Sequence, residues 1–186
     1  MTDSMGHSEW FSAEVFSQVV TWPAFDEFPR PWLSTAARAL KDRLPAGLDR
    51  SRCGLFWASD LDSIAADRIF ERSRREDAGR FASPAAFRST LAGIDPSALA
   101  LELAISGPVI TFSIEADTTI AVQSARRWLE AGRLHAAIVI CESAHDADRP
   151  YTQAAAGVTP PQLARFIHVT LMITRRSPAF TAPSGQ

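Results

Sequence analysis

The sequence has few of the residues that most metal and cofactor chemistry requires. Its 186 residues include two cysteines, Cys53 and Cys141, which form no C-x-x-C pair and have no metal-ligand spacing with the histidines. Each cysteine lies in an apolar run, where a thiol is typically buried and inert. Lys41 is the only lysine and therefore the only candidate for Schiff-base chemistry. We expect neither a metal nor a cofactor.

Long apolar stretches are also missing. No segment approaches the roughly 20 apolar residues that span a bilayer. The polar amino terminus does not have the basic and then apolar order of a signal peptide. The formal net charge is -2, whereas nucleic-acid-binding domains are usually basic. The sequence therefore predicts a cytoplasmic protein that neither inserts into a membrane nor binds nucleic acid.

Hydrophobic residues make up 46% of the chain, which suits a domain with a real core. We expect a single domain over residues 1–176 and a flexible, proline-bearing tail over 177–186. Residues 1–31 are rich in aromatic side chains and contain three prolines that interrupt regular structure. We expect an irregular segment here. It either wraps the domain surface or presents its aromatic side chains as a contact patch.

Apolar patterns along the rest of the chain predict alternating helices and strands. Helical spacing predicts helices over 32–44, 60–77, 95–107 and 118–131, and a short helix that begins at Ser83-Pro84. Gly132 stands where a left-handed C-cap of the helix over 118–131 belongs. Continuous apolar runs predict strands over 54–59, 108–114, 136–141 and 166–174. Such runs are typical of a sheet that is covered on both faces. We therefore predict an α/β fold with a mostly parallel sheet and helices on its faces.

Residues 142–161 follow neither a helical nor a strand period. A loop of this length is unusual inside a compact domain unless it is functional or disordered.

Residues 53–144 contain several short segments that resemble the β-ketoacyl synthase family when they are taken together, in order and at their spacing. These are the strand over 54–59 with Asp60 after it, Ser83-Pro84 with Phe87, a helix that ends in Gly107-Pro108, Thr111-Phe112-Ser113, and the strand over 136–141. The strand over 166–174 more loosely resembles the one that closes the amino-terminal half of these proteins. The resemblance implies half of a thiolase-type layered fold.

The family places its nucleophilic cysteine in the turn after the strand that here ends near Ser113. That cysteine stands at a helix amino terminus, where the macrodipole lowers the pKa of a thiol. Alignment on residues 111–113 puts Ala116 at this position, and alanine is not a nucleophile. Ketosynthases complete their site with histidines from a carboxy-terminal half, and the histidines here match no such motif. The resemblance therefore implies a protein without condensing activity of its own.

Two carboxylates flank Ala116 and allow two interpretations. Asp117 precedes Thr118 as a helix N-cap would, and Glu115 near the same helix end gains from the dipole. Alternatively, one carboxylate acts as a general base in a pocket. Chain-length-factor subunits, the non-catalytic partners of ketosynthases, also lack the cysteine and commonly have an acidic residue just before its position. Glu115 fits this pattern, whereas Ala116 differs from their frequent glutamine.

The resemblance favours a chain-length-factor-like subunit that pairs with an active ketosynthase in fatty-acid, polyketide or aryl-polyene type biosynthesis. One alternative is a homodimeric binding or scaffold protein. Another is a small hydrolase or lyase that uses Glu115, Asp117 or His145, the histidine that lies in the irregular segment beside Asp146.

The family dimerises through the strand before the nucleophile turn. The resemblance therefore implies an interface made, together with the following helix, of Pro108, Val109, Ile110, Thr111, Phe112, Ser113 and Trp128. Acyl carrier proteins are acidic and dock on arginine-rich surfaces. The candidates for docking are Arg126, Arg127 and Arg133, with Arg72, Arg74 and Arg75 on another helix. The alternative for these arginines is simple solvation.

Overall fold

The computed structural model describes residues 10–21, 31–59, 64–76, 80, 82–113, 119–144 and 164–174. Its strands are β1 (Trp10–Thr21), β2 (Cys53–Ser59), β3 (Val109–Ser113), β4 (Ala136–Ala144) and β5 (Ala164–Thr174). Its α-helices are α1 (Pro31–Arg43), α2 (Ile64–Arg75), α3 (Pro84–Ser89), α4 (Ile94–Glu102) and α5 (Thr119–Glu130), and a short 3₁₀ helix covers Arg50–Arg52. The expected tail over 177–186 lies outside the described residues.

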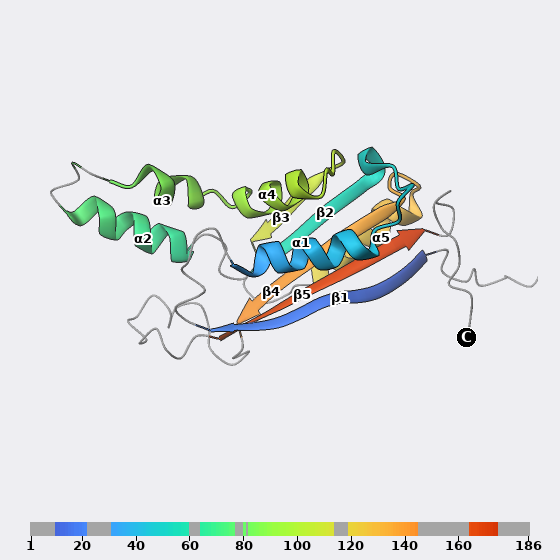
Figure 1. Ribbon diagram of the computed structural model, residues 1–186, viewed down its shortest axis with the longest axis horizontal. Coiled ribbons are helices and arrows are strands. Elements are labelled where there is room, and N and C mark those ends of the chain that lie inside the picture. The colour runs from blue at the N-terminus through green and yellow to red at the C-terminus, as the bar shows by residue number, and fades with distance from the viewer. Residues whose placement is uncertain are drawn as a thin grey trace, which may run out of the picture.

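All five strands form one sheet in the order β1-β5-β4-β2-β3 (Figure 1). Strand β2 is parallel to β3 and β4, whereas β5 is antiparallel to both β4 and β1. The predicted α/β fold with helices on the sheet is confirmed, but the sheet is mixed rather than mostly parallel. An apolar run indicates that a strand is buried. It does not encode the strand's direction, which depends on the path of the chain between β4 and β5.

Strand β1 corrects the prediction of an irregular segment over 1–31. Its 12 residues, Trp10–Thr21, pair with β5, and the register shifts between Glu14 and Phe16. This bulge breaks the alternation of apolar and polar residues by which a half-buried strand is recognised. The prolines that suggested irregular structure all follow Thr21. The other residues of this segment, 1–9 and 22–30, lie outside the described part, and Pro31 begins α1.

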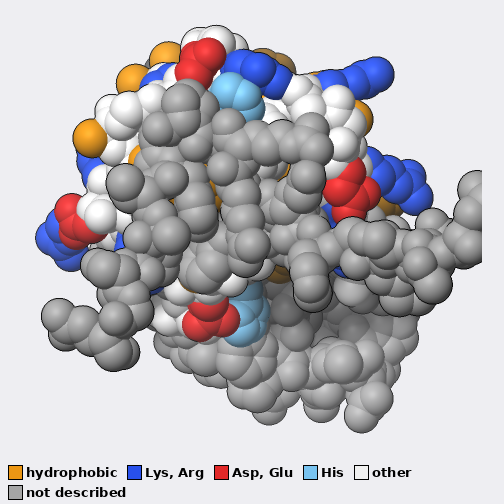
Figure 2. Space-filling model, turned by 90° about the vertical axis from the view of Figure 1, so that its right-hand side faces the viewer, with side chains coloured by type: hydrophobic (Ala, Val, Ile, Leu, Met, Phe, Trp, Pro, Cys, Tyr) orange, Lys and Arg blue, Asp and Glu red, His pale blue; other side chains and the backbone are white. Residues whose placement is uncertain are grey.

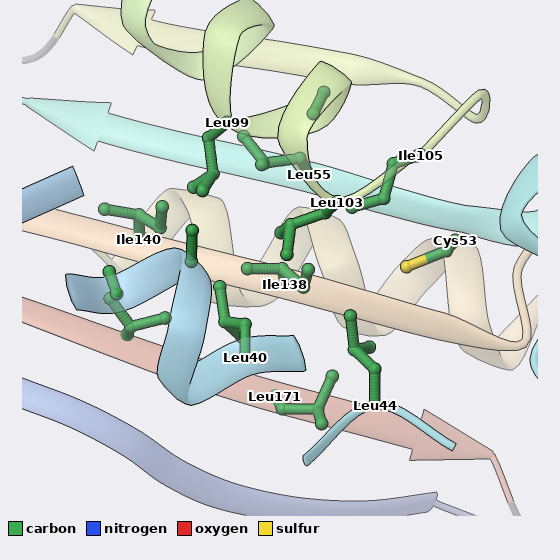
Figure 3. Close-up of a cluster of buried hydrophobic side chains, with 14 of the residues drawn as sticks. Leu40, Leu44, Cys53, Leu55, Leu99, Leu103, Ile105, Ile138, Ile140 and Leu171 are labelled. Carbon is green, nitrogen blue, oxygen red and sulfur yellow. The ribbon is translucent and has the colours of Figure 1, made fainter. Parts of the chain in front are cut away.

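Helices α1 and α4 cover one face of the sheet. Their side chains pack with those of β2, β4 and β5 in one buried cluster, in which Leu40, Leu55 and Ile138 are 0% exposed (Figure 3). The ring centroids of Trp32 and Trp57 lie 5.4 Å apart across this layer. Full burial stabilises each such side chain by about 1.5–3 kcal/mol, so this layer is the main core of the described residues.

Helix α5 covers the other face, above β2 and β4. Ala121 and Ala125 are fully buried, and their small side chains let the helix approach Phe56 and Val139 closely. Because helices lie on both faces, every residue of β2 is buried. This explains why the run over 54–59 is continuously apolar instead of alternating.

Helix α4 ends earlier than the sequence predicts. We expected Gly107 to end it, but Glu102 is its last residue and Ala104 adopts a left-handed φ of 54°. The Ile105 amide then donates to the Ala100 carbonyl at 2.8 Å, which closes the helix end. Gly132, by contrast, has a φ of 66° directly after α5, as its predicted role as a C-cap requires.

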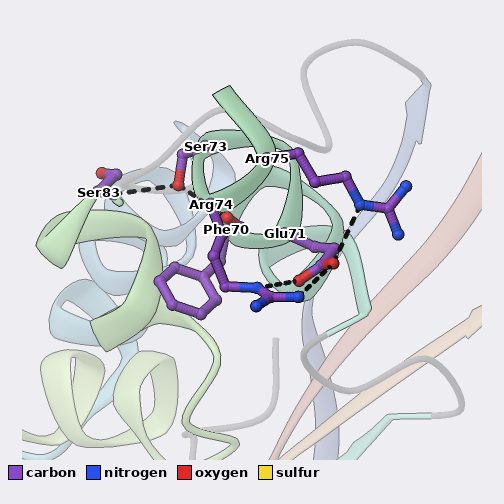
Figure 4. A network of polar contacts seen from close by, with 6 residues as sticks. All are labelled: Phe70, Glu71, Ser73, Arg74, Arg75 and Ser83. Atoms are coloured by element: carbon purple, nitrogen blue, oxygen red, sulfur yellow. Dashed lines mark hydrogen bonds and ion pairs between the residues drawn. The ribbon is translucent and has the colours of Figure 1, made fainter. Parts of the chain in front are cut away.

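Helices α2 and α3 pack against each other and project beyond the end of the sheet at which β2 and β3 finish (Figure 1). The rings of Phe70 and Phe87 lie 5.2 Å apart between them. The Ser83 amide donates to the Ser73 hydroxyl at 3.0 Å, which fixes the start of α3 against α2 (Figure 4). This pair of helices is therefore an ordered projection.

Among the described residues, no helix is long and apolar enough to cross a membrane. Within the same part of the chain, no three acidic, histidine or cysteine side chains are grouped as a metal site would need.

Candidate functional site

The strand and the helix that flank the predicted nucleophile position are both present. Strand β3 ends at Ser113 and the next described element, α5, begins at Thr119. Glu115, Ala116 and Asp117 belong to the segment between them and lie outside the described residues, as does His145. The structure thus confirms the strand-to-helix frame and leaves the two interpretations of the carboxylates open.

The carboxyl ends of the three parallel strands lie together at one end of the sheet. Ser113, Ser59 and Glu142 are neighbours in register across β3, β2 and β4. Ser59 is 1% exposed and Glu142 is 0% exposed. The carboxyl end of the strands is where open parallel sheets usually bind ligands. Sequence reasoning missed Ser59 and Glu142, although each is a polar residue at the end of an apolar strand run.

Strand β3 is an edge of the sheet, which is what the predicted interface requires. The Pro108 carbonyl accepts from the Leu55 amide at 2.8 Å. In a parallel ladder, the backbone groups of every second residue face the same neighbouring strand. Pro108 faces β2, so the backbone amides of Val109 and Thr111 face away from β2. Such outward amides can pair with a further strand. The predicted interface residues of β3 therefore lie at an edge that has no strand neighbour among the described residues.

Large apolar side chains are exposed on β3 itself, on α4, which packs against it, and at the start of the helix that follows it along the chain. Leu101 on α4 is 81% exposed, Val109 on β3 is 37% exposed, and Ile120 in the first turn of α5 is 39% exposed. Trp128, which we also expected at the interface, is half-buried and makes an edge-to-face contact with Phe56 at 6.3 Å. Among the described residues, exposed large apolar side chains also occur on α3 and just after it, where Phe87 is 54% and Leu91 is 55% exposed, whereas Trp128 packs on the sheet.

The predicted carrier-docking arginines lie far from the start of α5, toward the opposite end of the sheet. Helix α5 runs back from the carboxyl end of β3, and its 12 residues span about 18 Å. Arg126 and Arg127 lie in its second half, and Arg133 follows it and stacks over Trp128 at 5.5 Å. Figure 2 views this end of the molecule, with Lys and Arg side chains at its margin.

A second group of arginines lies on the α2–α3 projection. Arg74 and Arg75 bind the Glu71 carboxylate at 2.7 and 3.0 Å (Figure 4), and these hydrogen bonds lower its pKa to about 2. Three further arginines are exposed here and make no ion pair with the residues that the structure describes: Arg72, Arg80 and Arg88. This basic surface lies at the end of the sheet where β3 finishes (Figure 1).

The two cysteines differ in their surroundings. Cys53 is 0% exposed, and burial raises the pKa of its thiol to about 12, so it is inert as expected. Cys141 is only half-buried, on the α5 side of β4, which corrects the expectation that both thiols are buried.

The comparison with solved structures identifies the fold. The ishigamide ketosynthase/chain length factor matches with a TM-score of 0.57 and 20% identity, over 75% of this chain and 43% of that one. A ketosynthase in complex with its chain length factor from Xenorhabdus doucetiae matches with a TM-score of 0.56 and 18% identity, over 87% and 46%. The chain has a ketosynthase-type, thiolase-like fold.

A ketosynthase in complex with its type II polyketide acyl-carrier protein has the same fold, with a TM-score of 0.54 at 15% identity over 77% of this chain and 45% of that one. The chain spans less than half the length of each of these structures. No family model and no curated protein matches the sequence. The resemblance found in the sequence is thus confirmed at the level of the fold.

Proposed function

We propose that this chain is a ketosynthase-like subunit that has no condensing activity of its own and pairs with an active ketosynthase. The biosynthesis it serves is of the fatty-acid, polyketide or aryl-polyene type. The observation that carries the proposal is the open edge at β3, with exposed Leu101 and Val109 beside it. Two of the similar structures are complexes of a ketosynthase and a chain length factor.

The proposed interface extends the sheet across two subunits. Outward backbone amides on β3 pair with a strand of the partner, and the exposed side chains of α4 and α5 are covered at the same time. Leaving large apolar side chains in water costs about 1.5–3 kcal/mol each, so a partner that covers them gains a similar amount.

Lack of condensing activity rests on Ala116. The resemblance puts this residue where the family has its cysteine, and a methyl side chain forms no thioester. Neither cysteine replaces the missing nucleophile. Cys53 is buried at the start of β2, and Cys141 lies in β4, not in the turn between β3 and α5.

The proposal includes docking of an acidic acyl carrier protein. Of the two arginine groups, we favour the α2–α3 projection, because it lies on the side of the sheet at which β3 ends. Arg72, Arg80 and Arg88 supply the positive charge there. A carrier at Arg127 and Arg133 would lie most of the length of α5 away from its first residue, Thr119.

Co-purification tests the pairing. The chain is co-expressed with a ketosynthase encoded beside it, and the mass of the product is measured by light scattering after gel filtration. We expect a stable heterodimer for the wild type and for Thr111→Val. Thr111→Pro removes the outward amide at the edge and is expected to abolish the complex. A homodimer that does not bind the ketosynthase would support a scaffold protein instead. A heterodimer that still forms with Thr111→Pro would show that β3 does not make the interface.

A further inference from the structure

Three neighbouring strands bring a thiol, an imidazole and a carboxylate to one face of the sheet. Cys141 on β4 stands directly opposite His168 on β5, and His168 stands opposite Ser17 on β1. Cys141 packs against the cluster under α5. His168 is four residues from Met172, which belongs to that cluster, and residues an even number apart on a strand share a face, so His168 also faces the α5 side. Directly opposed residues have Cβ atoms about 4.5–5.5 Å apart, which places the thiol and the imidazole next to each other.

The imidazole is oriented from the β1 side. Nδ1 of His168 lies 3.3 Å from a Glu14 carboxylate oxygen and 3.3 Å from the Ser17 hydroxyl oxygen. A carboxylate at one ring nitrogen orients the ring and favours the tautomer whose other nitrogen can accept a proton. Nε2 is that other nitrogen. The Ser17 hydroxyl is not the nucleophile of such an arrangement, because it shares Nδ1 with the carboxylate.

We propose that Cys141 is a reactive thiol, activated by His168 and Glu14, and that it is a site of covalent modification by small disulfides. The Cys141 proton passes to the imidazole, and the thiolate attacks one sulfur of the disulfide. The S–S bond of the reagent breaks, a mixed disulfide forms on Cys141, and the released thiolate takes up a proton. The reagent is the oxidant, so the exchange is balanced.

The electrostatic surroundings support an activated thiol. On the described residues of β1, β4 and β5, the titratable side chains of this face are Glu14, Cys141 and His168. The first half of α5, residues 119–125, contains no charged residue. Among these described residues, the titratable side chain directly opposite the thiol is therefore the imidazole, which can take up its proton.

The chain contains its own reference thiol. Cys53 is fully buried at the start of β2, and no side chain of the Cys141 cluster is near it in the register of the sheet. A difference in reactivity between Cys141 and Cys53 therefore measures local activation within one molecule. The inference is independent of the proposed pairing with a ketosynthase, because it concerns β4, β5 and β1 and not the edge at β3.

Alkylation with iodoacetamide, followed over pH 5.5 to 9 by peptide mass spectrometry, tests the inference on the full chain. We expect the reaction at Cys141 to have a pH midpoint clearly below the ordinary thiol pKa of about 8.5, with Cys53 unreacted. Glu14→Gln and His168→Gln should return the midpoint to the ordinary value and slow alkylation at pH 6.5 by about tenfold. Thr170→Val, on the same face of β5, is the matched control and should change nothing.

Incubation with glutathione disulfide near pH 7 then tests the modification itself. A mixed disulfide on Cys141 that forms more slowly in Glu14→Gln is expected. A wild-type midpoint at the ordinary value, an unreactive Cys141, or a midpoint that neither variant changes would each overturn the inference. Glu14 is 58% exposed, so Glu14→Gln keeps the test valid even if His168→Gln disturbs the fold.

Discussion

A Cβ atom on Gly107 would lie 2.2 Å from the carbonyl oxygen of Cys53. The chain therefore passes from α4 into β3 directly against the backbone at the start of β2. The Ser106 and Gly107 amides both donate to the Arg50 carbonyl, at 3.1 and 3.2 Å, and hold this approach in place. Only glycine fits here, because the clash would be with the backbone and not with a flexible side chain.

Gly107→Ala should consequently destabilise the protein by more than about 2 kcal/mol, because strands β2 and β3 must separate to admit the methyl group. Gly132→Ala is the comparison. It has open space around it and a φ of 66°, so we expect a loss of about 1–2 kcal/mol from backbone strain alone. Urea denaturation followed by circular dichroism gives both values. Equal losses for the two variants would contradict the close approach.

The elements that could be predicted from the sequence are those that leave a clear local pattern of apolar residues. Strand β2 is buried on both faces, and its apolar run predicted it almost to the residue. Helix α5 and its cap at Gly132 were also predicted, since a helical period and a glycine at positive φ are local features. Strand β1 was missed because a bulge and an exposed face remove the local signal.

Spatial neighbours could not be predicted, because they depend on strand order and register. The opposition of Cys141 and His168 follows from the antiparallel pairing of β4 with β5, 27 residues apart along the chain. The placement of Arg127 and Arg133 toward the opposite end of the sheet likewise follows from the direction of α5. Glu115, Ala116 and Asp117 were found by resemblance alone, and their roles remain predictions.

The purified chain should form no condensation product from an acyl thioester and a malonyl carrier. Ala116 stands at the nucleophile position of the resemblance, and no acyl-enzyme can form there. Product analysis by mass spectrometry, with an active ketosynthase as the positive control, checks this. Turnover by the chain alone, above the blank without protein, would show that another residue acts as the nucleophile.

Charge reversal on α2 and α3 should weaken carrier binding more than the same change beside α5. Arg72→Glu combined with Arg88→Glu is expected to raise the dissociation constant for an acyl carrier protein about tenfold or more at low salt. Arg127→Glu combined with Arg133→Glu is the matched control and should have little effect. Binding is measured by calorimetry on the complex with the ketosynthase. A larger effect in the α5 variant would show that the carrier docks at Arg127 and Arg133 instead.

Binding to this surface should also weaken as salt rises, because ionic screening shortens the range of the arginine charges to about 3 Å at 1 M. An affinity that is insensitive to salt would show that the arginines are only solvated.

Helix α2 should lose stability in strong acid. Hydrogen bonds from Arg74 and Arg75 lower the pKa of Glu71 from 4.5 to about 2. The lowered pKa means that ionised Glu71 stabilises the folded state above pH 4.5, and that this stabilisation is lost as the pH falls toward 2. The protection factors for hydrogen exchange in α2, compared between pH 5 and pH 2.5, should fall more in the wild type than in Glu71→Gln. An identical acid response of the two proteins would show that the ion pairs contribute nothing.

Sedimentation velocity at micromolar concentration, with and without a co-encoded ketosynthase, tests the central claim most directly. The proposed pairing rests on an edge strand with exposed Val109 and Leu101 beside it. We expect a heterodimer with the ketosynthase, lost in Thr111→Pro and kept in Thr111→Val. A single species near the chain mass of 20.3 kDa, unchanged when the ketosynthase is added, would contradict the account.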